Sequence, residues 1–367
     1  MRIELKKVLF PQPKSKIKAG DGKAEGKYKF FTSSPIQSKF VDEANYDKPA
    51  LIFGTGGNAS VHFCNEPFST STDCLVMYGR SKIELETIYN YLKSNIGMLE
   101  NGFKGAGLKH ISKDYILAIE IDLPSEEIQL DFLQKNRIID GLIEAKQAQL
   151  HLSEELVKSR FIEMFGDSEH NTMNWPTAKL STLCDVGSSK RIYQSELTEN
   201  GIPFLRISDL NERIDGEYNE PQLFIPNERF DELKTNGLVP SAGDILVTAR
   251  GTLGRCYIVK TEDKFYFQDG MISWLSDIRE NITSLYISEL FATTGVQKQI
   301  ANFQAGSTVA YLSIAMLKKL DIMMPPKALQ QQFATFVEQI DKSKFEIQKS
   351  LEKLETLKKA LMQKYFG

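Results

Sequence analysis

The chain contains 367 residues, of which 41% are hydrophobic and 25% charged, and its formal net charge is −3. This composition is typical of a globular protein of two or three domains, and it excludes collagen-like and wholly disordered chains. No stretch approaches the ~18 consecutive apolar residues of a membrane span, and no signal segment follows Met1. We therefore expect a cytoplasmic protein without membrane contact, which could bind nucleic acid only through local basic patches.

In chain order, the sequence predicts mixed regions of short strands and glycine turns that alternate with long helices. The predicted boundaries are a mixed region at 1–124, a long helix at 125–166, a second mixed region at 167–324 and a second long helix at 325–367. One short helix is expected in each mixed region, at about 82–94 and 284–303. The first fifty residues carry eleven Lys or Arg against six Asp or Glu, a local basic excess.

A glycine-rich segment, Phe53-Gly54-Thr55-Gly56-Gly57, follows a strand-like run. It could bind a nucleotide or S-adenosylmethionine, but the next residues resemble another strand, and no acidic residue stands at the usual distance. A tight hairpin is therefore favoured. The corresponding hairpin at 248–255 carries two arginines, a combination suited to phosphate or guanine contacts.

The four cysteines are scattered without a CxxC pair, which argues against a zinc site or a disulfide framework. The four histidines lack the spacing of metal ligands, so no metal site is expected. The sequence also has no tetrad for amino-group methylation, no P-loop and no nuclease pattern. Catalytic activity in this chain is therefore poorly supported.

The C-terminal third repeats an earlier segment at one constant offset. Gly105 then falls on Gly306, Pro124 on Pro325, and the ending Phe165-Gly166 on Phe366-Gly367. Two unrelated amphipathic helices would not share the proline and the Phe-Gly ending in one register, so we interpret the similarity as a duplication.

Each copy continues after its proline as one helix of roughly 60 Å. Apolar residues recur at every seventh position, with gaps in each helix, so the two helices are expected to pack on each other as an intramolecular coiled coil and on further partners. The residues predicted to pack are Phe132, Ile139, Leu150, Phe333, Ile340, Ile347 and Leu354. The fold class is thus α+β, with two mixed α/β domains alternating with two long helices.

Polar loops of both mixed regions carry side chains that could contact DNA. Each loop alone is an ordinary solvated turn, but their recurrence in a duplicated chain favours DNA binding. The candidates of the first region are Thr32, Ser33, Ser34, Asn58, Lys104, Lys109 and His110. Those of the second are Lys190, Arg191, Arg206, Ser208, Arg250, Thr252, Arg255, Ser307 and Thr308.

Across essentially its whole length the sequence resembles the specificity (S) subunit of Type I restriction–modification systems. The resemblance lies in the segments at 26–34 and 201–210, in Gly243-Asp244-Ile245-Leu246 with Gly251-Thr252-Leu253-Gly254, in the "GLKHIS…LP" and "GSTVAYLS…PP" segments, and in the two closing helices with "MFGD" and "KYFG". One departure is the opening at Trp175-Pro176, which has no counterpart in the first region.

The resemblance implies two target-recognition domains, each binding half of an asymmetric bipartite DNA target. The two long helices, packed as an antiparallel intramolecular coiled coil, would act as the spacer between them. It further implies that the chain is non-catalytic and binds no cofactor. Two modification subunits with S-adenosylmethionine would methylate adenine N6, and restriction subunits with ATP and Mg would translocate and cleave. Two alternatives stay open: a coiled-coil adaptor with two protein-binding domains, and a self-sufficient methyltransferase.

Overall fold

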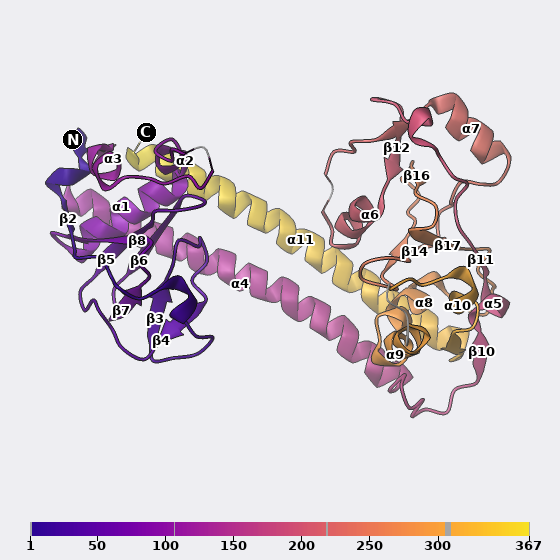
Figure 1. Cartoon of the computed structure of the whole chain (residues 1–367). Coiled ribbons are helices and arrows are strands. Elements are labelled where there is room, and N and C mark those ends of the chain that lie inside the picture. Colours follow the sequence, from indigo (N-terminus) through magenta and orange to yellow (C-terminus); the bar gives the residue numbers. More distant parts are fainter. Residues whose placement is uncertain (1, 106, 218, 305–309, 367) are drawn as a thin grey trace. The chain divides into compact units, whose positions relative to one another are not determined.

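The computed structural model describes residues 2–105, 107–217, 219–304 and 310–366. The chain divides into two compact units (Figure 1). Unit 1 comprises Met1–Gln149 with Glu346–Gly367, and unit 2 comprises Leu150–Phe345. Two long helices, α4 (Glu126–Phe165) and α11 (Lys327–Phe366), each contribute one end to each unit. A unit is therefore a globular region closed by the ends of both helices.

Unit 1 contains short strands and three short α-helices before α4. The strands are β1 (Arg2–Glu4), β2 (Leu9–Pro11), β3 (Tyr28–Phe31), β4 (Lys39–Val41), β5 (Ala50–Gly54), β6 (Ser60–Cys64), β7 (Phe68–Thr70), β8 (Cys74–Gly79) and β9 (Glu120–Asp122). The helices are α1 (Lys82–Ser94), α2 (Gly97–Glu100) and α3 (Lys113–Ala118), with 3-10 turns at Leu5–Lys7 and Ala19–Asp21.

Unit 2 has a matching set of elements. Its strands are β10 (Thr177–Lys179), β11 (Asp185–Gly187), β12 (Ile202–Leu205), β13 (Phe224–Ile225), β14 (Ile245–Thr248), β15 (Cys256–Ile258), β16 (Tyr266–Phe267), β17 (Ile272–Ser276) and β18 (Asp321–Met323). Its short helices are α5 (Leu180–Leu183), α6 (Ile207–Ile214), α7 (Asn227–Thr235), α8 (Ser284–Phe291), α9 (Thr294–Phe303) and α10 (Ile314–Leu317), with a 3-10 turn at Gln194–Glu196.

The two units share one sheet topology. The antiparallel sheet β2-β8-β5-β6 of unit 1 corresponds to β11-β17-β14-β15 of unit 2, and β4-β3-β7 corresponds to β13-β12-β16. In both three-stranded sheets the inner strand pairs in parallel with its later neighbour. A two-stranded ladder, β1-β9 or β10-β18, joins the start of each region to the strand before the long helix. The duplication therefore includes the globular regions, whose sequences are far less alike than the helices.

An aromatic cluster completes the junction between helices in each unit. In unit 1, the fully buried Phe132 of α4 meets Phe366 of α11 edge to face, with ring centroids 4.9 Å apart. In unit 2, Phe333 of α11 meets Phe165 of α4 at 5.5 Å, again near perpendicular. Edge-to-face rings attract because the positive edge of one faces the negative face of the other. The same contact thus occurs twice, with the two helices exchanging roles.

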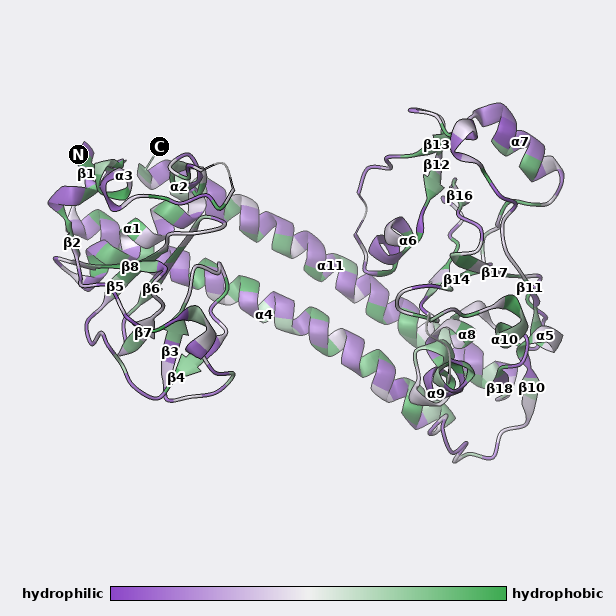
Figure 2. Ribbon diagram, viewed as in Figure 1, coloured by the Kyte–Doolittle hydropathy of each residue, from purple (hydrophilic) through white to green (hydrophobic). Residues whose placement is uncertain are grey.

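The helix pair runs antiparallel within each unit. In unit 1, Lys358 of α11 bonds Asp140 of α4, and Tyr365 bonds Asp131. In unit 2, Lys344 lies 3.8 Å from Glu154. Figure 2 shows both long helices with hydrophobic bands alternating with hydrophilic ones, the pattern of helices that pack along one stripe. The predicted fold class, with its antiparallel intramolecular coiled coil, is confirmed.

A buried glutamine fixes the entry to each long helix. Gln129 Nε2 donates to the Pro124 carbonyl at 2.8 Å, and Gln330 Nε2 donates to the Pro325 carbonyl at 2.9 Å. Gly166 ends α4 with a φ of +80°, and an added Cβ would lie 2.6 Å from Thr172 Oγ1. Glycine is required at this turn because other residues are strained at positive φ and crowded here.

The short helices and the opening of unit 1 differ in part from the sequence predictions. The helix predicted at 82–94 is α1, but the one predicted at 284–303 is two helices, because Thr293 is extended and begins α9. The prediction of one short helix in each region was wrong, since single turns such as α5 and α10 are too short to show periodicity. The opening of unit 1 does have a counterpart. Leu5 N donates to Ile119 O and Leu180 N to Leu320 O, so β1 corresponds to β10.

The packing residues predicted from the heptads are all wholly or partly buried. Phe132, Ile139 and Phe333 are at most 5% exposed. The others, each of intermediate exposure, are Leu150, Ile340, Ile347 and Leu354.

Phe333→Ala tests the aromatic junction of unit 2. We expect a loss of about 3–5 kcal/mol in unfolding free energy, because truncation of a buried phenylalanine leaves a cavity. Urea unfolding followed by tryptophan fluorescence measures this, since both tryptophans, Trp175 and Trp274, belong to unit 2. The control is Phe345→Ala on the same helix, where the side chain is 66% exposed. Equal effects of the two changes would refute the role of the junction.

Candidate nucleic-acid interface

Three polar loops meet in unit 1. They are the loop after β3, the turn between β5 and β6, and the segment before α3. Ser33 Oγ lies 3.4 Å from Gly56 N, and Ile111 N donates to Thr55 O at 3.2 Å. His110 Nδ1 lies 3.1 Å from the same Thr55 carbonyl. The hairpin predicted at Gly54–Gly57 is confirmed by the antiparallel pairing of β5 with β6.

The structure brings most predicted contact residues of unit 1 into this cluster. Ser33 and His110 bond the hairpin turn directly, and Gly57 N donates to Lys109 O at 3.3 Å. Asn58 lies exposed in the same turn. Lys104 pairs with His110 through two backbone hydrogen bonds, and Thr32 and Ser34 complete the loop after β3. The residues are scattered in sequence because the turns of different sheets supply them.

His62, on β6, contacts the loop after β3. Its Nε2 lies 2.9 Å from the Ser34 carbonyl oxygen. The centroid of its ring lies 5.2 Å from the centroid of the Phe31 ring. Burial lowers the pKa of His62, and the charge of Lys93 adds to this effect, although the Ser34 carbonyl opposes it. The side chain is therefore held as a neutral imidazole that donates to Ser34.

Unit 2 assembles the same three elements. Its hairpin turn lies between β14 and β15, the segment before α10 joins it through Leu312 N→Ala249 O at 3.0 Å, and α6 follows the loop after β12. Arg255 Nη1 donates to Asn211 Oδ1 of α6 at 2.8 Å, and its guanidinium pairs with Asp215. Thr252, exposed in the turn, accepts from Thr248 Oγ1 through its carbonyl.

Arg250 and Tyr311 form a stacked pair at this hairpin. The guanidinium carbon of Arg250 lies 4.5 Å from the centroid of the Tyr311 ring. Tyr311 was not predicted from the sequence, although it falls on His110 at the offset of the repeat, which is the signal that could have identified it. In unit 1 the corresponding imidazole faces Gly56, where an added Cβ would lie 3.2 Å from its Cε1.

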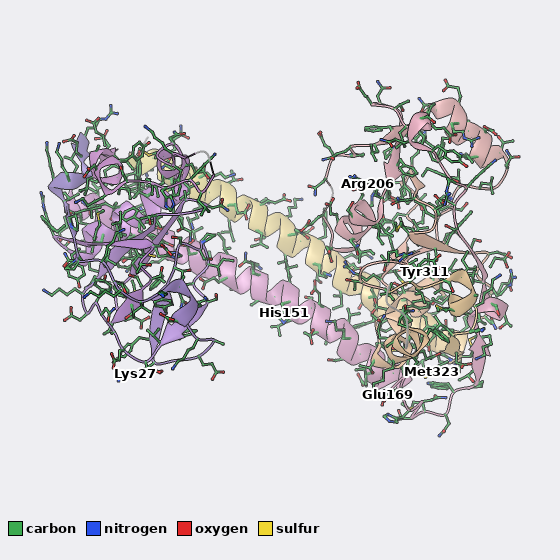
Figure 3. The ribbon with its side chains drawn as sticks, in the orientation of Figure 1. Lys27, His151, Glu169, Arg206, Tyr311 and Met323 are labelled. Carbon is green, nitrogen blue, oxygen red and sulfur yellow. The ribbon has the colours of Figure 1, made fainter. Side chains whose placement is uncertain are left out.

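A groove of about 860 Å³ in unit 2 is lined by two more predicted residues, Arg191 and Arg206. Arg191 pairs with Asp269 at 3.0 Å, and Arg206 lies 3.6 Å from Asp209. Figure 3 labels both Arg206, near α6, and Tyr311 in unit 2. The groove carries both charge signs, which suits selective polar contacts better than general attraction to phosphate.

The remaining described candidates of unit 2, Ser208 and Lys190, make contacts outside the hairpin turn. Ser208 bonds Asp209, and Lys190 N donates to Tyr266 Oη at 2.8 Å. Ser307 and Thr308 lie outside the described residues. The contact roles of all these residues stay predictions.

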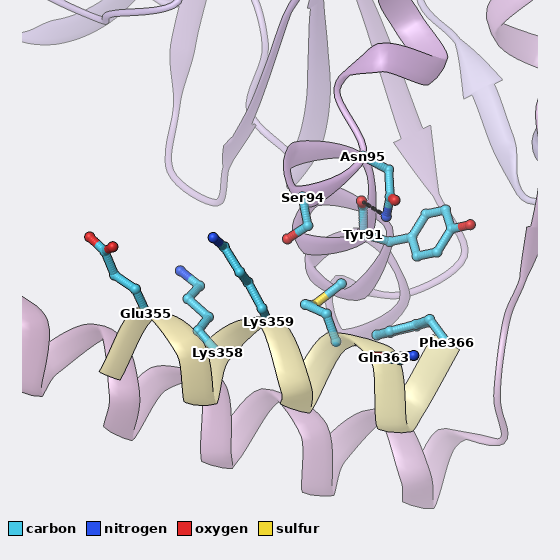
Figure 4. Close-up of a pocket in the computed structure, with 9 residues that line it drawn as sticks. Tyr91, Ser94, Asn95, Glu355, Lys358, Lys359, Gln363 and Phe366 are labelled. Atoms are coloured by element: carbon cyan, nitrogen blue, oxygen red, sulfur yellow. Dashed lines mark hydrogen bonds between the residues drawn. The ribbon is translucent and has the colours of Figure 1, made fainter. Parts of the chain in front are cut away.

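A second pair of matching features occurs where the long helices end. Hollow 1, about 520 Å³, is lined by the end of α11 and by α1, including Lys359, Met362 and Tyr91. In Figure 4, Glu355, Lys358 and Lys359 of α11 line one side, opposite Ser94 and Asn95. Hollow 2, about 300 Å³, is lined by the end of α4 and by the residues after α8.

The two hollows occupy equivalent places. Lys158 in hollow 2 and Lys359 in hollow 1 are the same residue at matching positions of the repeat, and Phe161 replaces Met362. Glu289 also lines hollow 2, where burial and nearby Asp341 raise its pKa, while Lys344 and Lys158 lower it. Each unit therefore has one comparable indentation beside a lysine.

The sequence matches the family described as "Type I restriction modification DNA specificity domain" over residues 4–151 and 173–359. The chain belongs to this family. It is 24% identical over 372 residues to the Type I restriction enzyme MjaVIII specificity subunit of Methanocaldococcus jannaschii, a match covering 93% of this chain and 86% of that protein. The resemblance inferred from the sequence motifs is thus confirmed at the level of the family.

Solved structures share the fold of this specificity-subunit family member. The S subunit of a Type I restriction–modification system from M. genitalium superposes with a TM-score of 0.62 at 17% identity, covering all of this chain and 96% of the other. A chain from a study of complex assembly and conformational transition of the type I R-M system gives 0.57 at 14% identity, covering all of this chain and 97% of the other.

Within the described residues, no group of three or more His, Cys, Asp or Glu side chains is arranged to hold a metal ion. None of the helices described is long and apolar enough to cross a membrane.

The pKa of His62 predicts how the stability of unit 1 depends on pH. The folded chain disfavours the protonated ring, so the unfolded chain binds more protons below the ordinary pKa of 6.5. The contribution of His62 should therefore be present at pH 7.5 and be lost as the pH falls through 6.5.

Unfolding free energies of the wild type and of His62→Gln at several pH values measure this. The difference between the two proteins should shrink toward acid. His151→Gln serves as the control because His151 is exposed on α4. A difference that is constant across pH would show that His62 does not titrate as inferred.

Proposed function

We propose that this chain is the DNA-recognition subunit of a type I restriction–modification complex, and that each unit recognises one half of a bipartite target. The observation that carries the proposal is the recurrence of one three-loop cluster in both units of a chain from the DNA specificity family. A shared scaffold with different side chains in its loops is suited to binding two different base sequences. The target is therefore asymmetric.

The chemistry belongs to partner subunits in this proposal. Two modification subunits would bind S-adenosylmethionine and methylate adenine N6, and restriction subunits would use ATP and Mg to translocate and cleave. The chain itself is non-catalytic and acts in the cytoplasm, where the DNA and these partners are found. The methylated adenine must leave the base stack, so a subunit that holds the flanking duplex would assist the step.

Hollows 1 and 2 support binding of two copies of one partner. Each hollow combines apolar side chains with a lysine at the same repeat position, Lys359 or Lys158. Two equivalent surfaces on one chain can bind two identical subunits through the same contact. We assign them to the two modification subunits.

The first experiment is a single-molecule map of adenine methylation in a host that makes its own modification subunit, with and without this gene. We expect a split motif with two different halves that disappears on deletion, because the specificity subunit positions the methylating partner. Restoring the gene should restore the motif.

Expression of a competent modification subunit is the essential control in this map. An unchanged map in its presence would contradict the DNA-recognition proposal. It would favour the adaptor, which shares the helix pair but requires no DNA contact.

Native mass spectrometry of the assembled complex tests the hollows separately. Lys158→Glu and Lys359→Glu should each reduce the number of bound modification subunits from two to one, and the double variant should bind none, because each reverses the charge at one docking surface. Lys353→Glu, an exposed change on α11 outside both hollows, is the control. Full binding by the double variant would rule the hollows out.

A further inference from the structure

The two arginines of the β14–β15 turn are held in different ways. Arg255 donates to Asn211 and pairs with Asp215, so α6 already engages its terminal nitrogens. These contacts attach the turn to the helix that follows the loop after β12. Arg255 therefore stabilises the cluster by joining the turn to α6.

Arg250 has no such partner among the described residues. Its guanidinium stacks on Tyr311, and its Nε is buried without a hydrogen bond. An aromatic ring attracts a guanidinium at its face, while the N–H donors point outward in the guanidinium plane. With Nε buried, the two terminal NH₂ groups remain as a fork of donors.

The backbone of Tyr311, whose ring stacks on Arg250, is held by hydrogen bonds. Gln304 accepts from Tyr311 N at 2.9 Å and donates to Tyr311 O at 3.0 Å. The next residue, Leu312, donates to Ala249 O, one residue before Arg250. Because these bonds join the backbone segments that carry Tyr311 and Arg250, and the ring stacks on the guanidinium, the arginine is oriented before any ligand arrives, which lowers the entropy lost on binding.

We propose that Arg250 is the base-reading residue of unit 2 and that it recognises guanine in the major groove, with Tyr311 as its positioning residue. Guanine presents two acceptors there, O6 and N7, whose spacing matches a pair of arginine donors. The inference rests on the proposed function and assigns one base contact within it.

Unit 1 has a ring at the position of Tyr311 but no arginine at the position of Arg250. His110 occupies the position of Tyr311, and Gly56 occupies the position of Arg250. The corresponding place in unit 1 therefore makes no arginine contact to a base, which is one physical source of an asymmetric target. Base preferences in the half-site of unit 1 serve as an internal control.

The test measures methylation by the full chain assembled with its own modification subunit, on duplexes carrying each base at every target position. Wild type should prefer guanine at one position of one half-site by roughly 5- to 150-fold. Arg250→Ala should abolish that preference alone. Arg250→Lys should weaken the preference, because lysine retains the charge without the two paired donors of the guanidinium.

Variants of Tyr311 distinguish a loss of Arg250 positioning from a loss of folding. Tyr311→Phe keeps the ring and should keep the guanine preference, whereas Tyr311→Leu should weaken it. Lys234→Ala, which removes an exposed charge on α7, should change nothing. Tryptophan fluorescence verifies that unit 2 of each variant is folded.

Two results would overturn the inference. A uniform loss of methylation for all sequences with Arg250→Ala, restored by Arg250→Lys, would identify a phosphate contact. An unchanged motif with Arg250→Ala would show that the arginine touches no base. Failure of the proposed function is distinguishable, because the wild-type chain itself would then direct methylation to no motif.

Discussion

The structure depends on the closing of each unit by the ends of both long helices. Phe132 requires Phe366 from the far end of the chain, and Phe333 requires Phe165 from its middle. Burying these rings stabilises each junction by a few kcal/mol, and their near-perpendicular packing adds directional preference. In each unit the buried cluster at the helix ends contains residues from both halves of the sequence. Each globular region is therefore completed by a helix from the other half of the chain.

This constraint leaves the loops free to diverge. The strands and the junction carry the core, and the turns that join them lie at the surface, where sequence changes cost little stability. In unit 1 the hairpin turn is glycine-rich and faces an imidazole. In unit 2 the equivalent turn carries Arg250 and Arg255, held in two different ways. One scaffold can thus present different polar groups to different ligands.

The electrostatics of the interface are local. The net charge is −3, and several arginines of unit 2 already pair with carboxylates, among them Arg191 with Asp269. An arginine that is paired in the free protein contributes less to general attraction and more to shape and orientation. Selectivity from a few oriented donors is consistent with a chain that has no overall basicity.

The sequence by itself determined the long helices and their packing as a pair. Both follow from local or periodic information: the prolines at 124 and 325, the apolar positions at every seventh residue, and the shared Phe-Gly ending. The family and the antiparallel direction of the pair followed from the resemblance of the sequence motifs. The hairpins at Gly54–Gly57 and at 248–255 were also predictable, because glycine turns between strand-like runs are local signals.

Only the tertiary structure decided that the globular regions share one topology. Their strands are two to six residues long, and the residues that pair them lie far apart in sequence, so no periodicity records the register. It also decided which candidate residues meet. Arg250 and Arg255 are alike in sequence, and their difference arises because Tyr311 and Asp215 come from elements that only folding brings to the turn.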